Sequence, residues 1–148
     1  KSADSTRIYL GCFPTLSTGA PIPLRMKRGR YLYNFSGSAA ADTLALNAGT
    51  ATVDTAVDLA AWVPLHSQVA TIRAYLVSTT GAAWNTAIIR TEGESGADEI
   101  GMFVPAVVGA SATVITDIIT DADQDIAYAV TNFTSAPGLS ISVHGFYE

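Results

Sequence analysis

Three groups of side chains in this sequence have the types and spacing that could bind or react. The first is basic: Arg25, Lys27, Arg28 and Arg30 lie within six positions of the stretch PLRMKRGRYL, in a chain with eight bases and a formal net charge of -5. Such a cluster could bind a phosphate or an acidic glycan, dock on an acidic neighbouring subunit, or protect a sheet edge from pairing. On a strand these charges would point to both faces, which favours an edge strand, a loop or a subunit contact.

The second group is acidic. Asp121, Asp123 and Asp125 in TDADQDI have the spacing of the first three ligands of a calcium-binding loop. An EF-hand is excluded, because Ile126 replaces the glycine that the loop needs and Asn132 replaces its bidentate glutamate. A solvated acidic turn between two strands is favoured over a looser calcium site at these carboxylates. We therefore predict no metal and no cofactor.

The third group is aromatic. Trp62 and Trp84, with the aromatic residues of YLYNF, could form a platform on which sugar rings stack. The alternative is that these rings fill the core or an interface of a β protein. A glycan-binding or receptor-binding module is accordingly the second functional hypothesis, with Trp62 and Trp84 as its candidate residues.

The residue types that commonly catalyse reactions form no recognisable catalytic motif in this sequence. Glu92 and Glu94 lie in EGESGADE, which reads as an exposed loop with no reason for raised pKa values. Cys12 is the single cysteine, and neither His66 nor His144 lies in a local signature of a nucleophilic site. No phosphate-binding glycine loop, Cys/His metal spacing or nucleophile elbow is present. We predict that the protein is not an enzyme.

The composition favours a β protein that associates with other subunits. Of the 148 residues, 49% are hydrophobic and only 14% are charged, well below the usual quarter. So few charges do little to keep a lone monomer soluble, so we expect a homo-oligomer. An acidic pI of about 4.8 argues against nucleic-acid binding, and the short apolar runs argue against a membrane span.

Strands must position these groups, because apolar and polar residues alternate along much of the sequence. In Val69–Val77, Ala70, Ile72, Ala74 and Leu76 form an apolar face that should meet the core. Pro64 marks a loop or an edge, and AADTLAL or DTAVDLAAWV could instead form a helical turn. The pattern predicts an all-β, antiparallel β-sandwich, jelly-roll-like, with about eight to ten strands. Residues 1–30 are predicted as an N-terminal arm with the first strand, and residues 31–148 as the sandwich.

Two stretches resemble small β-sandwich modules of tailed-bacteriophage virion structural proteins. They are AVDLAAWVPLHSQVATIRAYLVST and the closing DADQDIAYAVTNFTSAPGLSISVHGFYE, and the resemblance covers Ala56–Leu76 and Asp121–Glu148. In that family the module occurs in tail fibres, tail tips and other surface components and usually carries no catalytic site. The Pro-rich N-terminal third departs from the pattern and could reach over a neighbouring subunit.

The resemblance implies a virion structural protein on the particle surface, as head decoration, fibre or tail component. Its expected partners are further copies of itself in a homotrimer, other virion proteins, and a host surface glycan if it binds a receptor. The basic residues Arg25, Lys27, Arg28 and Arg30 are then predicted to dock an acidic neighbour.

Overall fold

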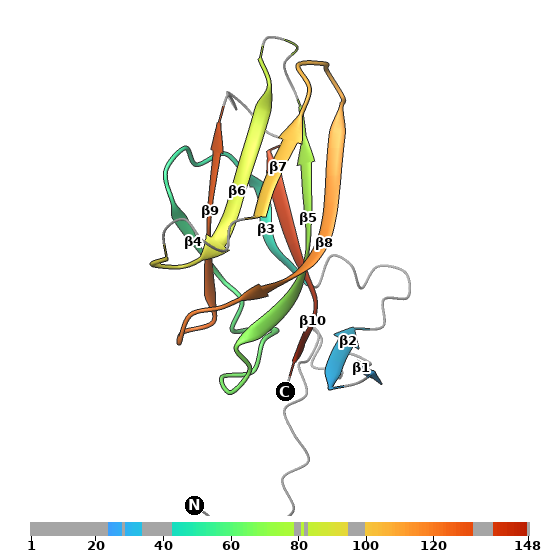
Figure 1. The fold of residues 1–148 in the computed structure, drawn as a ribbon, viewed down its shortest axis with the longest axis vertical. Coiled ribbons are helices and arrows are strands. Elements are labelled where there is room, and N and C mark those ends of the chain that lie inside the picture. Colours follow the sequence, from blue (N-terminus) through green and yellow to red (C-terminus); the bar gives the residue numbers. More distant parts are fainter. Residues whose placement is uncertain are drawn as a thin grey trace, which may run out of the picture.

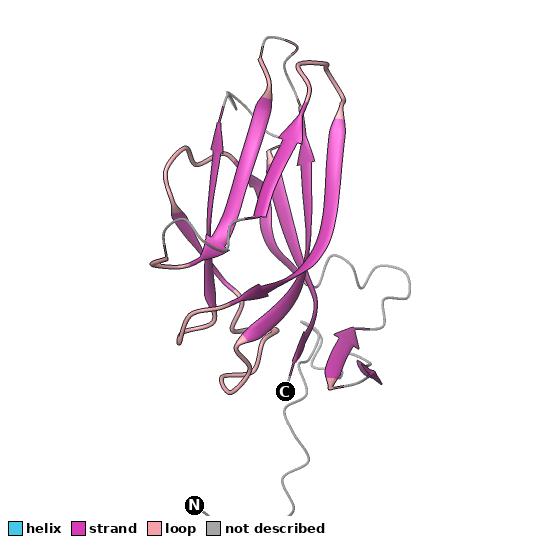
Figure 2. Cartoon of the chain, in the orientation of Figure 1, coloured by secondary structure: helices cyan, strands magenta, loops and turns pink. Residues whose placement is uncertain are grey.

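The computed structural model of the chain describes residues 24–27, 29–33, 43–78, 81, 83–94, 100–131 and 138–147. Within these ranges the chain forms strands and loops and no helix (Figure 2). The strands are β1 (Leu24–Lys27), β2 (Arg30–Tyr33), β3 (Leu44–Gly49), β4 (Thr55–Asp58), β5 (Val69–Val77), β6 (Asn85–Thr91), β7 (Ile100–Val104), β8 (Ser111–Ile119), β9 (Asp125–Thr131) and β10 (Leu139–Tyr147).

The strands form two antiparallel sheets that face each other (Figure 1). One sheet has the order β1-β2-β10-β5-β8, with β3 also paired to β10, and the other has the order β4-β9-β6-β7. From β3 to β10, every step along the chain except β6–β7 crosses from one sheet to the other. The orders β3-β10-β5-β8 and β4-β9-β6-β7 are those of a jelly roll, so the predicted all-β sandwich is confirmed.

Strand β10 organises the six-stranded sheet. Along one side it pairs with β5, and along the other its first residues pair with β3 and Gly145–Tyr147 pair with β2. The register shifts between Val143 and Gly145, which makes His144 the extra residue of a bulge. A Cβ on Gly145 would lie 2.1 Å from the carbonyl oxygen of Tyr31, so only glycine allows β2 to approach here.

The described part of the predicted arm includes β1 and the first residue of β2, Arg30. β1 is an edge strand that pairs with β2, and β2 joins the sheet through β10. The predicted boundary at residue 30 therefore falls at the start of β2. Residues 1–23 lie outside the described residues.

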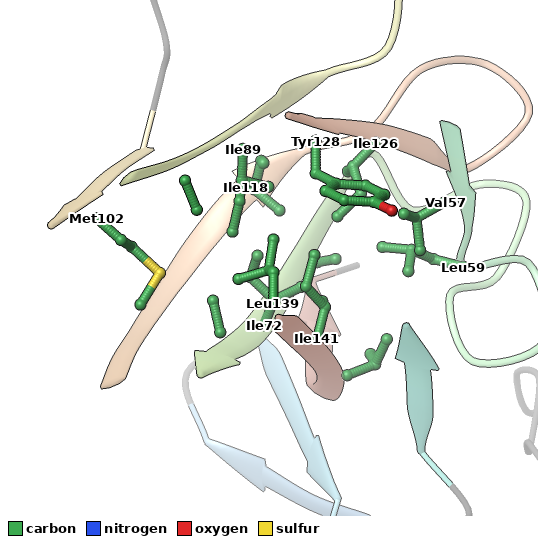
Figure 3. Close-up of a cluster of buried hydrophobic side chains, with 14 of the residues drawn as sticks. Val57, Leu59, Ile72, Ile89, Met102, Ile118, Ile126, Tyr128, Leu139 and Ile141 are labelled. Carbon is green, nitrogen blue, oxygen red and sulfur yellow. The ribbon is translucent and has the colours of Figure 1, made fainter. Parts of the chain in front are cut away.

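The core lies between the sheets and follows the predicted alternation. Ala70, Ile72, Ala74 and Leu76 of β5 are fully buried, as the sequence predicted. Figure 3 shows side chains from the two sheets converging, with Ile141 of β10 on one side and Tyr128 of β9 on the other. Burial of each large aliphatic side chain contributes roughly 1.5–3 kcal/mol.

Of the two stretches that could form a helical turn, DTAVDLAAWV forms one in the connection between β4 and β5. The backbone N–H groups of Trp62 and Val63 both donate to the carbonyl of Leu59, at 2.8 and 2.9 Å. This is a single turn and does not continue as a helix, because Pro64 follows it at once. Pro64 lies in the loop, as predicted. In the other stretch, AADTLAL, residues 44–46 belong to β3, and residues 40–42 lie outside the described residues.

Candidate assembly surface

The structure places the described members of the basic cluster on the two strands of one hairpin, with Lys27 directly opposite Arg30. Arg25 and Lys27 lie on the edge strand β1, Arg28 is outside the described residues, and Arg30 begins β2. An edge strand that carries charge agrees with the edge-protection alternative for the cluster.

Arg30 is engaged within the chain. Its Nη2 donates to Asp117 Oδ1 at 2.5 Å, and its Nε and Nη2 donate to Thr71 Oγ1 at 3.0 and 2.9 Å. The guanidinium also lies 5.4 Å from the ring centroid of Tyr147, within reach of a cation–π interaction. Arg30 therefore fastens the β1–β2 hairpin to β5, β8 and β10.

Asp117 is the centre of this network. It also accepts hydrogen bonds from the hydroxyl of Thr71 at 2.7 Å and from the phenol of Tyr147 at 2.8 Å. The hydrogen bond to Asp117 raises the pKa of Tyr147 above its ordinary value of 10.0, with smaller contributions from burial and from the charge of Asp117. Arg30 and Asp117 are 87 positions apart, and no local pattern in the sequence connects them.

The two tryptophans lie at opposite ends of the four-stranded sheet. β4 and β6 both run antiparallel to β9, so they run in the same direction. Trp62 follows the last residue of β4, whereas Trp84 precedes the first residue of β6. Trp62 is half-buried against the core, and Trp84 is 63% exposed. The predicted pair therefore does not form one sugar-stacking platform.

The acidic group closes a turn between β8 and β9. The Oδ1 of Asp121 accepts from the backbone N–H groups of Asp123 and Asp125, at 2.9 and 2.7 Å. Burial raises the pKa of Asp125, and the charges of Asp121, Asp58, Asp123 and Glu92 raise it further. Within the described ranges, no three His, Cys, Asp or Glu side chains are arranged to hold a metal ion.

The residues considered for catalysis are spread over separate elements. His66 is exposed in the loop before β5, and Glu92 and Glu94 follow the end of β6. His144 lies in the β10 bulge, where burial and then the charge of Arg73 lower its pKa below the ordinary value of 6.5. Cys12 lies outside the described residues.

One side of the sandwich collects exposed apolar side chains. In the described chain, eleven large hydrophobic side chains are exposed, and six of them lie on β7, on β8, in the turn between these strands or beside β7. The six are Trp84 (63%), Phe103 (68%), Val107 (59%), Val108 (69%), Ile115 (60%) and Ile119 (51%). Figure 1 shows β7 and β8 joined by a loop at the top of the view. We call this edge of the molecule the β7–β8 side.

The β7–β8 side also lacks free charge. From Ile100 to Ile119 the sequence contains one charged residue, Asp117, and its carboxylate is paired with Arg30. Ala112 and Val114 of β8 point toward the core but remain only partly buried, because no further described strand pairs with β8 beyond β5. Phe103 points outward from the four-stranded sheet, whereas Ile115 and Ile119 point outward from the six-stranded sheet, so these side chains border this edge from both faces of the sandwich. Large exposed apolar patches mark protein interaction sites. The sequence analysis did not identify this side, although the uncharged run of residues 100–116 was the available signal.

Comparison with known protein families finds no family that matches this chain, and comparison with curated proteins finds no match. No helix in the described part of the chain is long and apolar enough to span a membrane.

Proposed function

We propose that this protein is a non-enzymatic structural subunit that works by subunit–subunit assembly. The observation that carries the proposal is the β7–β8 side, which holds six of the eleven exposed large hydrophobic side chains among the described residues. The single charge between Ile100 and Ile119 is neutralised within the chain. Burying this surface against another subunit removes apolar area from water without separating a charge from its partner.

The setting we propose is the surface of a tailed-phage virion, as head decoration, fibre or tail component, with other virion proteins as neighbours. The resemblance of Ala56–Leu76 and Asp121–Glu148 to virion modules supports this setting. The jelly-roll strand order is compatible with it, since this order recurs in viral capsid and lectin domains. Fold alone does not assign function, so the assembly surface and the resemblance carry the proposal together.

The assembly step is tested by sedimentation velocity and light scattering at physiological salt over a wide range of protein concentration. We expect a homo-oligomer that is a multiple of the 15.4-kDa chain. A protein that stays monomeric at every concentration would refute assembly through itself. Quantitative mass spectrometry of purified particles tests the setting and gives the copy number, and absence from particles would refute a virion role.

A second candidate function is glycan binding, which the exposure of Trp84 favours. An aromatic ring that is 63% exposed at a strand end can stack on the apolar face of a sugar. A glycan array tests this with Trp84→Ala, and with Leu65→Ala as the matched control because Leu65 is 76% exposed in another loop. Loss of binding in Trp84→Ala alone supports the candidate, whereas no binding by the unmodified protein removes it.

A further inference from the structure

β8 differs from every other edge strand that the structure describes. β1 and β4 have four residues each and carry charges, β7 has five residues, and two register shifts interrupt the pairing of β3 with β10. β8 has nine residues in unbroken register with β5, which is about 30 Å of strand. It contains no proline, lysine or arginine, and these are common devices that block pairing at an edge. β8 is therefore a long, regular and unprotected edge.

The side chains of β8 show which partner would fit. Ser111, Thr113, Ile115, Asp117 and Ile119 point outward, since they pair with the outward residues of β5. Ile115 is the middle residue of the nine and is 60% exposed. If the strand pairs antiparallel with a copy of itself along its whole length, the two-fold axis places its middle residue opposite its own copy. Ile115 would then meet Ile115 of the second copy, an apolar pair at the centre.

The same register also gives each remaining outward residue of β8 a compatible neighbour on the second copy. Thr113 lies opposite Asp117 of the second copy, and Ser111 lies opposite Ile119. Cross-strand pairs of this kind avoid like charges, which are destabilising when directly opposite. On the inward side, Val114 lies opposite Thr116, so the partly buried Val114 gains cover. A second copy carries the chain's net charge of -5. β8 itself brings only Asp117, which is paired with Arg30, and the exposed Arg73 of β5 lies beside Ile115.

We propose that two copies of the protein pair antiparallel through β8 about a two-fold axis at Ile115, which joins their six-stranded sheets into one continuous sheet. This inference rests on the proposed function and specifies its contact. The unit is a dimer, which differs from the trimer that the sequence suggested. Backbone hydrogen bonds along the edge would give the affinity, and the β8 side chains would set the register.

Disulfide crosslinking tests the register. In a Cys12→Ser background, Ile115→Cys places two thiols opposite each other, with Cβ atoms about 4.5–5.5 Å apart, which is close enough to form a disulfide after a small adjustment. Thr113→Cys is the matched control on the same face of the same strand. Its copy lies four residues further along, about 14 Å away, beyond the reach of a disulfide. We expect a crosslinked dimer with Ile115→Cys and a monomer with Thr113→Cys on denaturing gels.

Charge substitution tests the contact itself. Ile115→Lys would bring two ammonium groups together at the axis, so we expect the 15.4-kDa monomer where the unmodified protein sediments at twice that mass. Val53→Lys, at a side chain that is 71% exposed in the β3–β4 connection, should leave the dimer intact. Thermal melting of both variants checks that the fold survives. Two results would overturn the proposal: crosslinking of Thr113→Cys equal to that of Ile115→Cys, or an oligomer unaffected by Ile115→Lys. Either result would refute the β8 contact but not self-assembly. A monomeric unmodified protein would refute both the β8 dimer and the proposed self-assembly.

Discussion

The network around Asp117 predicts the strength with which the β1–β2 hairpin is attached to the sandwich. The side chains of Arg30 and Asp117 are 30% and 38% exposed, so their ion pair contributes less than about 1 kcal/mol. Thr71 is only 1% exposed, and its hydroxyl would lose its acceptor, which costs roughly 1–2 kcal/mol. Asp117→Ala should therefore lower the free energy of unfolding by about 2–3 kcal/mol.

Urea denaturation measures this change, at protein concentrations low enough that self-association does not contribute. Asp123→Ala is the control, because it removes the same charge from an exposed turn residue and should change stability by about 0.5 kcal/mol or less. Limited trypsin digestion gives a second readout: cleavage after Arg30 should be slow in the unmodified protein, where β2 is paired on both sides, and faster in Asp117→Ala. Equal stability of the two variants, with equal cleavage after Arg30, would refute the role of the network.

Two further substitutions probe β10. Gly145→Ala should destabilise the protein by at least about 2 kcal/mol, because the new Cβ would lie 2.1 Å from the Tyr31 carbonyl oxygen. Gly81→Ala, whose Cβ would meet nothing closer than 3.6 Å, should be nearly neutral, and equal melting temperatures would contradict the reasoning. The lowered pKa of His144 gives stability that is present above pH 6.5 and is lost as the pH falls through the folded-state pKa. Urea titrations from pH 7.5 to 5.5 should show this loss, and His144→Gln should flatten it while His66→Gln does not.

Local patterns in the sequence were enough to predict the strands and the core face of β5. The alternation at Ala70, Ile72 and Ala74 has the period of a strand, and a buried face is the direct consequence. The jelly-roll class was also within reach, because many short strands without a helical period leave few architectures. The bulge at His144 could not be predicted from the sequence, since it depends on where β2 and β5 pair with β10.

The candidate site was harder to predict because it depends on distant contacts. Arg30 reads as one of four clustered bases, and only the fold brings it to Asp117. Trp62 and Trp84 read as a pair of similar aromatic residues, yet the parallel directions of β4 and β6 put them at opposite ends. The free backbone edge of β8 also depends on β8 being the last strand of its sheet, and strand order cannot be read from alternation alone.

The proposed dimer would give different roles to the two ends of the six-stranded sheet. β1 forms one end and carries Arg25 and Lys27, while β8 forms the other and has only the paired Asp117. If β8 pairs with a second copy, both β1 edges face outward at the ends of the joined sheet. Charges there oppose addition of a further strand, so the assembly closes at two copies and does not grow into a fibre. Replacing Arg25 and Lys27 with threonine should therefore leave the dimer intact but promote larger species with rising concentration. Light scattering measures this, and a variant that remains strictly dimeric would show that the bases do not limit growth.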